Sequence, residues 1–390
     1  FELGNTYVVE NKNDNAIATY DKLVSEFKTG IYAAKSVLKQ GLIYYNSDKD
    51  QLAITKFKKV AADYPNTAEA LEAVSTARLI YVDNGKVDEY ATWVKTLNFV
   101  QVTDAELDND TYEAAEKKYL ENNVKPAIAG FTGYLANFPN GIHALKVNFY
   151  LGQLYFADNL ENNAIPNYEF VIARQRNEFT EQALVRLSQI YLKSKDYEKA
   201  IVVLKRLEVE ADFPQNITFA QANLMKSYYE KEDYINAVLA AEKVLNNPKT
   251  DDKVRSDAQI IIARSAIKSN DNAKAKIAYA KLLTIAKGEL AAEALFYDAY
   301  FKNQDEKFED SNTAIQKLTK NYSGYKYFGA KGLVVMAKNF YGLKDAFQAN
   351  YILDSMIKNF TDFPDVVEEA KKEQAIIQTE EAKTNSSVGK

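Results

Sequence analysis

Residues 41–65 read GLIYYNSDKDQLAITKFKKVAADYP, and this stretch decides the fold. Gly41 and Tyr44 stand three residues apart, which places a small and an aromatic side chain on one face of a helix. The polar run NSDKD that follows contains the residue types that end one helix and cap the next. Ala53 then opens a second apolar helical pattern, which Pro65 ends because proline lacks a backbone donor. The stretch therefore predicts a helix, a turn, a helix and a breaker.

The same pattern recurs about every 37 residues, ten times in all. One position near the start of each second helix holds a small residue in nine of the ten repeats. We call it the anchor position. Seven residues after the anchor every repeat has an apolar residue, and nine residues before it seven repeats have an aromatic one. A fixed period in this range indicates stacked supersecondary units rather than one globular core. The anchor residues are Ala16, Ala53, Tyr90, Ala127, Ala164, Ala200, Ala237, Ala275, Ser311 and Ala349.

This pattern resembles the tetratricopeptide repeat (TPR) family. The residues that carry the resemblance are Gly41 and Tyr44 in the first helix, Ala53 and Phe57 in the second helix, and Pro65. The usual family period is about 34 residues, so these units are slightly longer. The resemblance covers the chain from its start to about residue 361. It implies an all-α fold, an α-solenoid of about ten helix-turn-helix repeats that forms a right-handed superhelix.

The period divides the chain into four segments. Residues 1–101 hold TPR-like repeats, the first truncated and the third degenerate, and residues 102–361 hold the remaining repeats. A charged C-terminal capping helix is expected at 362–383, because a solenoid needs a polar element to close its open end. Residues 384–390 are expected to form a disordered tail. The chain starts at Phe1, in the middle of a first helix, so we expect that residues before it have been lost.

The third repeat departs most from the pattern. Arg78 stands where most repeats have a small residue, Tyr90 replaces the anchor alanine, and the only tryptophan, Trp93, lies beside it. One interpretation is a hinge or a boundary between two sub-solenoids at 101/102. The other, which is the simpler one, is a worn repeat followed by an ordinary linker.

The acidic run after this repeat has alternating carboxylates. Calcium ligands in an EF-hand loop alternate in this way, but the loop also needs Gly at its sixth position and Glu at its twelfth. Asn109 and Ala115 stand at those positions, so a solvated, helix-capping acidic loop is the better interpretation. The carboxylates concerned are Asp104, Glu106, Asp108 and Asp110.

Composition narrows the function classes. With 49 Lys and Arg against 54 Asp and Glu, the net charge is −5, which argues against nonspecific nucleic-acid binding. No apolar run is long enough to span a membrane. The chain has no cysteine, and His143 is its only histidine, expected at a helix start rather than at a catalytic centre. No nucleotide-binding glycine motif occurs. We therefore expect no enzymatic activity, no catalytic residue, no cofactor and no metal.

The resemblance directs attention to the first helix of each repeat, which lines the concave groove in TPR proteins. Eight residues before the anchor, nine of ten residues are apolar. We call these positions the rail row. The row could be an aromatic rail for a peptide or helix; its uniformity favours packing against adjacent repeats instead. The rail row is Val8, Tyr45, Val82, Tyr119, Phe156, Leu192, Tyr229, Ile267, Asn303 and Tyr341.

Basic residues gather near the rail row in the C-terminal half. They could favour an acidic partner segment, although Glu230 and Glu293 lie nearby and favour a mixed, solvated face. The basic residues are Lys193, Lys226, Arg264, Lys268 and Lys338. The complete set of candidate partner-binding residues is Tyr45, Phe156, Lys193, Lys226, Tyr229, Arg264, Lys268, Lys338 and Tyr341.

The expected function is a non-enzymatic scaffold that binds a protein or peptide partner through the concave groove, in a cell-envelope assembly. Two alternatives remain: a chaperone-like adaptor that grips extended polypeptide, and the interaction region of a larger protein with another activity upstream. The aromatic-proline turns at 63–67 and 137–141 look like those of TPR proteins from the Gram-negative periplasm. The Lys-, Asn- and Tyr-rich composition resembles that of Bacteroidetes proteins. These resemblances imply a periplasmic or outer-membrane-associated location.

Overall fold

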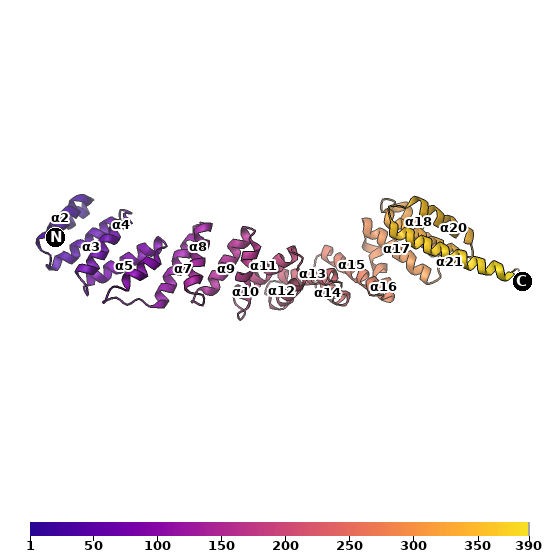
Figure 1. Ribbon diagram of the computed structural model, residues 1–390, viewed down its shortest axis with the longest axis horizontal. Coiled ribbons are helices and arrows are strands. Elements are labelled where there is room, and N and C mark those ends of the chain that lie inside the picture. Colours follow the sequence, from indigo (N-terminus) through magenta and orange to yellow (C-terminus); the bar gives the residue numbers. More distant parts are fainter. Residues whose placement is uncertain (389–390) are drawn as a thin grey trace. The chain divides into compact units, whose positions relative to one another are not determined.

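The computed structural model describes residues 1–388, with side chains described as far as Lys383. In this part of the chain the backbone forms 21 α-helices and no β-strand, which confirms the predicted all-α solenoid of TPR-like helix pairs (Figure 1). The contacts divide the chain into two compact units, Phe1–Arg186 and Leu187–Lys390. The handedness of the superhelix stays a prediction.

Unit 1 contains the first five helix pairs and the start of α11, and consecutive helices pack on one another along it (Figure 1). Its helices are α1 (Glu2–Val9), α2 (Asn13–Glu26), α3 (Ile31–Tyr45), α4 (Asp50–Asp63), α5 (Ala68–Asp83), α6 (Val87–Val94), α7 (Asp104–Leu120), α8 (Val124–Asn137), α9 (Ala144–Ala157), α10 (Glu161–Ile172) and α11 (Thr180–Lys193).

Unit 2 begins within α11 and continues with the same alternation of first and second helices. Its further helices are α12 (Tyr197–Glu210), α13 (Pro214–Glu230), α14 (Tyr234–Asn246), α15 (Asp252–Lys268), α16 (Asn272–Ile285), α17 (Gly288–Gln304), α18 (Phe308–Asn321), α19 (Lys326–Gly342), α20 (Ala346–Asn359) and α21 (Pro364–Val388).

The turn inside each repeat has one recurring backbone conformation. Five residues before every anchor, the backbone takes a positive φ between 54° and 69°. This left-handed conformation ends the first helix and lets the chain reverse, and it favours Gly or Asn. Its recurrence confirms that the ten repeats share one register. The ten residues are Asn11, Asp48, Gly85, Asn122, Asn159, Lys195, Glu232, Asn270, Glu306 and Lys344.

The anchors are buried in all ten repeats, and nine of them have no exposed surface. Twelve residues before the anchor, a glycine receives the aromatic ring of the second helix in three repeats of unit 1. A Cβ built on Gly41 would lie 2.5 Å from Cε1 of Phe57, and one built on Gly152 would lie 2.7 Å from Cε1 of Tyr168. The small residues of the pattern therefore set how closely the two helices of a repeat approach.

The final helix takes the place of an eleventh first helix. Thirty-seven residues after Ala337, which is the small residue of the tenth repeat, stands Gln374, whose amide donates to Asp354 at 2.9 Å. Helix α21 continues to Val388, five residues beyond the predicted end at 383, because no Gly or Pro interrupts it before that point. The rest of the predicted tail, 389–390, lies outside the described residues.

The third repeat is short, as its degenerate sequence suggests. Helix α6 has only eight residues, and residues 95–103 connect it to α7 without helical structure. The division into compact units nevertheless falls at Arg186/Leu187 and not at 101/102. A hinge or boundary at 101/102 stays a prediction.

Candidate functional site

The rail row is neither core nor free surface. All ten of its side chains are half-buried, with none fully enclosed and none fully exposed. Each residue therefore packs on its neighbours with one side and leaves the other side accessible. Inter-repeat packing and a binding surface, which the sequence presents as alternatives, are both compatible with this burial.

In unit 1 the surface around the rail row is apolar. Leu79 and Leu120 are 54% and 71% exposed, so they add accessible apolar surface to the half-buried rail row. We call the apolar residues at the rail position and at positions seven and eleven residues before the anchor in this unit the apolar face of unit 1. Its members are Val8, Val9, Leu42, Tyr45, Leu79, Val82, Tyr119, Leu120, Phe156 and Ala157.

Only two charged residues occur at these positions in unit 1, and both are in ion pairs. Asp83 lies 2.8 Å from the amino group of Lys117, and Glu116 lies 3.0 Å from that of Lys146. Pairing reduces the net charge that either carboxylate presents to a ligand. Electrostatically, the apolar face of unit 1 therefore suits an uncharged or apolar partner segment.

In unit 2 the same positions carry the basic residues singled out by the sequence, and three of them bind acids on the next first helix. Lys226 lies 2.7 Å from Asp257. Arg264 donates two hydrogen bonds to Glu293, at 2.6 and 3.0 Å. These cations link consecutive repeats, so they are not free to receive an acidic partner.

The partner of Arg264 is the most enclosed of these acids. The side chain of Glu293 is 5% exposed, and Tyr279 also donates to it at 2.7 Å. The hydrogen bond to Glu293 raises the pKa of Arg264, and burial raises the pKa of Tyr279. A buried carboxylate needs this degree of satisfaction, because an unpaired one is costly. The cluster therefore has a structural role.

At the end of unit 2, helix α21 covers part of the rail row. Lys338 lies 3.3 Å from Glu369 and 3.5 Å from Glu373, both on α21. Tyr341 donates to Glu380 at 2.8 Å, and this bond raises the pKa of Tyr341 to about 12. Both candidate residues of the tenth repeat, Lys338 and Tyr341, are thus bound by side chains of the capping helix.

The remaining candidate residues lie where the pattern places them. Lys193 and Lys268 are exposed at the ends of α11 and α15. Tyr229 is half-buried with its ring edge-on to Tyr234 at 5.9 Å. Of the two aromatic candidates in unit 1, Phe156 has the guanidinium carbon of Arg186 4.6 Å above its ring. No contact among these residues forms a single compact site.

A cavity of about 640 Å³ opens on the apolar face of unit 1. We call it the α7–α9 pocket, since most of its lining comes from the end of α7, the start of α8 and the length of α9. None of its lining residues is charged. They are Tyr119, Leu120, Asn122, Val124, Ala127, Phe149, Gln153, Leu154, Ala157 and Gln182.

The aromatic walls of this pocket are held in place from behind. The ring of Tyr119 stacks on that of Tyr150, with 4.4 Å between centroids, and Phe149 stacks on Phe179 at the same separation. Gln153 accepts a hydrogen bond from Tyr168 at 3.1 Å. The sequence predicts the rail position of Tyr119 but not the roles of Phe149 and Gln153; the available signal is that helix 144–157 has a single charged residue, Lys146.

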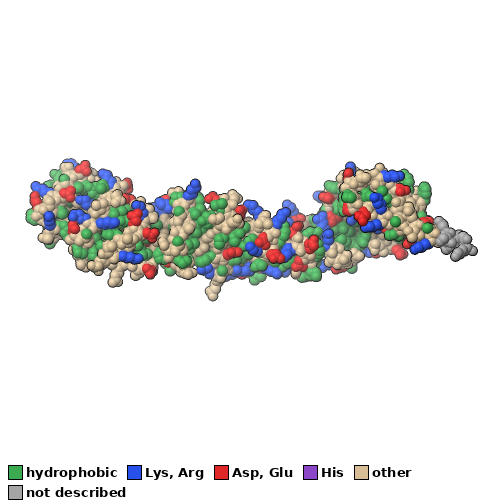
Figure 2. All heavy atoms as spheres, in the orientation of Figure 1, with side chains coloured by type: hydrophobic (Ala, Val, Ile, Leu, Met, Phe, Trp, Pro, Cys, Tyr) green, Lys and Arg blue, Asp and Glu red, His purple; other side chains and the backbone are tan. Residues whose placement is uncertain are grey.

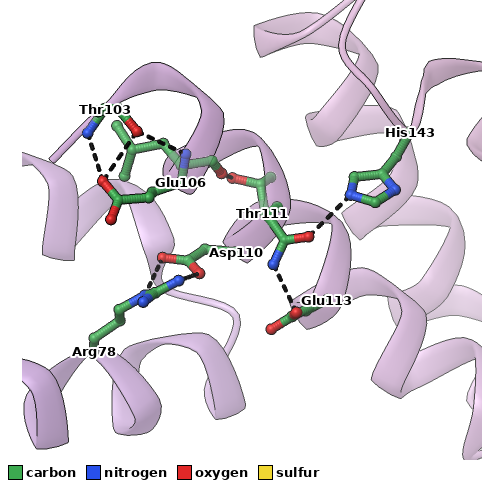
Figure 3. A network of polar contacts seen from close by, with 9 residues as sticks. Arg78, Thr103, Glu106, Asp110, Thr111, Glu113 and His143 are labelled. Atoms are coloured by element: carbon green, nitrogen blue, oxygen red, sulfur yellow. Dashed lines mark hydrogen bonds and ion pairs between the residues drawn. The ribbon is translucent and has the colours of Figure 1, made fainter.

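The acidic run that follows the third repeat lies on helix α7 and not in a loop (Figure 3). The interpretation as a solvated loop is therefore wrong, and this segment does not form a calcium-binding loop. Thr103 and Glu106 form a capping box that begins the helix. Arg78 donates two hydrogen bonds to Asp110, whose side chain is only 1% exposed. Arg78, which departs from the repeat pattern, therefore neutralises a buried carboxylate of the next repeat.

His143 completes a neighbouring cluster. Its ring stacks on Tyr112 with 3.9 Å between centroids. Its Nε2 lies 3.0 Å from Oδ1 of Asn109, a contact marked by the dashed line from His143 in Figure 3. Desolvation lowers the pKa of His143, so the neutral ring is favoured. Asp108 accepts hydrogen bonds from the hydroxyl of Tyr134 and the backbone of Ile142. These groups satisfy one another and serve packing.

Within the part of the chain that the structure describes, no group of three or more His, Asp or Glu side chains could hold a metal ion. Among the described helices, none combines the length and apolar character needed to cross a bilayer.

Two segments match models of the tetratricopeptide repeat, residues 35–67 and residues 181–207. A search of curated proteins finds no match. The similar solved structures include a tetratricopeptide repeat protein from Parabacteroides merdae, with 13% identity, 68% of this chain and 98% of that chain covered, and a TM-score of 0.33. They also include the C-terminal part of a TPR repeat-containing protein from Cytophaga hutchinsonii, with 17% identity, coverage of 66% and 98%, and a TM-score of 0.30. Yeast Tom70 matches with 12% identity, coverage of 97% and 95%, and a TM-score of 0.33.

Proposed function

We propose that the chain, whose matched segments are tetratricopeptide repeats, is a non-enzymatic scaffold that binds a protein or peptide partner through the apolar face of unit 1. One observation carries this proposal: Leu79 and Leu120 are more than half exposed, and the two charged residues at the positions that define this face, Asp83 and Glu116, are each in an ion pair. Burying apolar area in a complex contributes about 25 cal/mol per Å² before association costs. Figure 2 shows hydrophobic side chains reaching the surface between charges of both signs.

The basic positions of unit 2 support a different role. Lys226, Arg264 and Lys338 are each within ion-pair distance of an acid on the following first helix. An acidic partner would have to displace these acids before it gained any attraction. We therefore assign partner binding to unit 1 rather than to these basic residues of unit 2.

The chaperone-like alternative gains support from the α7–α9 pocket. An uncharged pocket with fixed aromatic walls suits a segment of extended polypeptide more than it suits a folded, charged surface. The scaffold and the adaptor differ in whether the bound segment belongs to one folded partner or to many extended chains.

We propose a location in the periplasm, in a cell-envelope assembly of a Bacteroidetes-like bacterium. The support is the long repeat period and the aromatic-proline turns at 63–67 and 137–141. Cell fractionation of a strain that carries a tagged native gene tests it. Recovery with the cytoplasmic fraction would contradict the proposal.

Site-specific photo-crosslinking tests the binding surface. A crosslinking amino acid placed at Leu79 should capture a partner from native envelope, and the same residue at Leu239 should not. Leu239 is the matched control, because it lies on helix α14 of unit 2 and is likewise 54% exposed. Equal capture at both positions would show that exposure alone, and not this face, produces the crosslink.

A further inference from the structure

We propose that the α7–α9 pocket binds an uncharged, extended stretch of a partner polypeptide and accepts one large apolar side chain between Tyr119 and Phe149. The inference rests on the proposed function and names the chemistry of the segment bound. Three properties of the pocket support it: the absence of charged lining residues, the two amide side chains in the lining, and the size of the cavity.

The pocket is uncharged in a chain where charged residues are common. Asp, Glu, Lys and Arg make up 26% of the sequence, yet none of the ten lining residues is among them. A charged side chain that entered would lose hydration and find no opposite charge, which is costly. The lining therefore selects against charged segments as well as favouring apolar ones.

Two amide side chains in the lining, Gln153 from α9 and Gln182 from α11, can form hydrogen bonds with a peptide main chain. Each glutamine carries a donor and an acceptor, as a peptide group does. The Oε1 of Gln153 accepts from Tyr168, so its NH₂ group remains to donate to a carbonyl of the ligand. Gln182 on α11 also lines the pocket, is exposed, and can both donate and accept.

The size and rigidity of the pocket fit several residues of extended chain. A cavity of about 640 Å³ exceeds what a single side chain fills and lies within the range of ligand sites, roughly 300–1,000 Å³. The stacked pairs Tyr119–Tyr150 and Phe149–Phe179 fix the walls before a ligand arrives. A pre-formed pocket loses less entropy on binding.

Peptide binding to the full chain tests the inference. The probes are capped ten-residue peptides of Ser, Thr and Asn that carry Phe-Leu at the centre, with matched peptides that carry Asp-Asp or Lys-Lys there. Fluorescence anisotropy should show the Phe-Leu peptide binding at least tenfold more tightly than either charged peptide. Equal binding of the three peptides, or no binding of the Phe-Leu peptide, would overturn the inference.

Variants locate the site. The substitution Gln153→Glu places a charge in the pocket and retains an oxygen that accepts from Tyr168, so the fold should persist; binding should weaken at least fivefold. Gln51→Glu adds the same charge on the exposed surface of α4 and should change binding less than twofold. Leu120→Asp, at a side chain that is 71% exposed, provides a second variant at the pocket that should fold.

The outcomes separate the two proposals. If crosslinking at Leu79 captures the partner and neither Gln153→Glu nor Leu120→Asp weakens peptide binding, the scaffold proposal stands and the pocket inference is wrong. If both pocket variants weaken binding and Gln51→Glu does not, the pocket inference is supported. If neither the crosslink nor the pocket variants give an effect, both proposals fail.

Discussion

The ring of Phe57 lies directly against the backbone of Gly41, where a Cβ would come within 2.5 Å of ring atom Cε1. This contact joins the two helices of the second repeat, and Gly4 with Tyr20 repeats it in the first. The helix axes can approach this closely only because the glycine has no side chain. The contact explains in atomic terms why a small residue recurs twelve positions before the anchor.

Gly41→Ala should therefore destabilise unit 1, although alanine is the better helix former by about 1 kcal/mol. The added methyl group forces the ring or the helix to shift, at a cost of about 1–3 kcal/mol. Gly133→Ala is the control, because that glycine lies inside α8 with nothing within 4 Å of its built Cβ. Urea unfolding should show a lower midpoint for the first variant and a slightly higher one for the second.

At the left-handed turn residues, substitution by glycine should increase the free energy of unfolding, whereas loss of a glycine lowers it at Gly41. Glu306 has a φ of 60°, a conformation that costs a side-chain-bearing residue about 1 kcal/mol relative to glycine. Glu306→Gly should raise the free energy of unfolding by about 0.5–1 kcal/mol. Gly85→Ala, at the equivalent position with φ 69°, should lower it. Thermal melts of the two variants provide the check; two shifts of the same sign would contradict the shared turn conformation.

The buried pair Arg78–Asp110 should behave as a coupled unit. Arg78→Ala leaves a carboxylate that is 1% exposed without its counter-charge, which costs about 3 kcal/mol. The double variant Arg78→Ala/Asp110→Ala should be more stable than Arg78→Ala alone, because removing Asp110 also removes the unpaired buried carboxylate. A double-mutant cycle in urea measures the coupling. Additive effects would show that the pair does not interact.

His143 should make stability depend on pH. Desolvation holds its folded pKa below the ordinary 6.5, so the unfolded chain binds the proton more readily. The stabilisation is then fully present above pH 6.5 and is lost as pH falls from 6.5 to the lower folded value. His143→Gln should remove this part of the decline, measured as the urea midpoint between pH 7.5 and 5.5. An unchanged pH profile in the variant would contradict the lowered pKa.

Much of the fold follows from the sequence because every repeat restates it. The anchor alanines, the small residue twelve positions earlier and the Asn, Asp and Gly turns fix the register of each helix pair. The predicted end of α21 at 383 is too early, because no Gly or Pro interrupts the helix before Val388. The alternating carboxylates from Asp104 predict a loop, because they resemble a ligand pattern, whereas the residues form the helix that Thr103 caps.

The candidate site was harder to predict, since it depends on contacts between repeats. Lys226 and Arg264 look free in the sequence, and their acids, Asp257 and Glu293, lie about 30 residues further on. Only the stacking of consecutive first helices shows that these charges pair. The same stacking brings Phe149 and Gln153 beside Tyr119 and so creates the pocket.

The most direct test of the account compares three variants in capture of the partner from native envelope: Leu79→Asp, Leu120→Asp and Leu239→Asp. All three replace exposed leucines, so folding should survive, and circular dichroism confirms it. We expect the first two substitutions to reduce capture at least tenfold and Leu239→Asp, on helix α14, to leave it unchanged. Undiminished capture by Leu79→Asp and Leu120→Asp would contradict the claim that the apolar face of unit 1 is the binding surface.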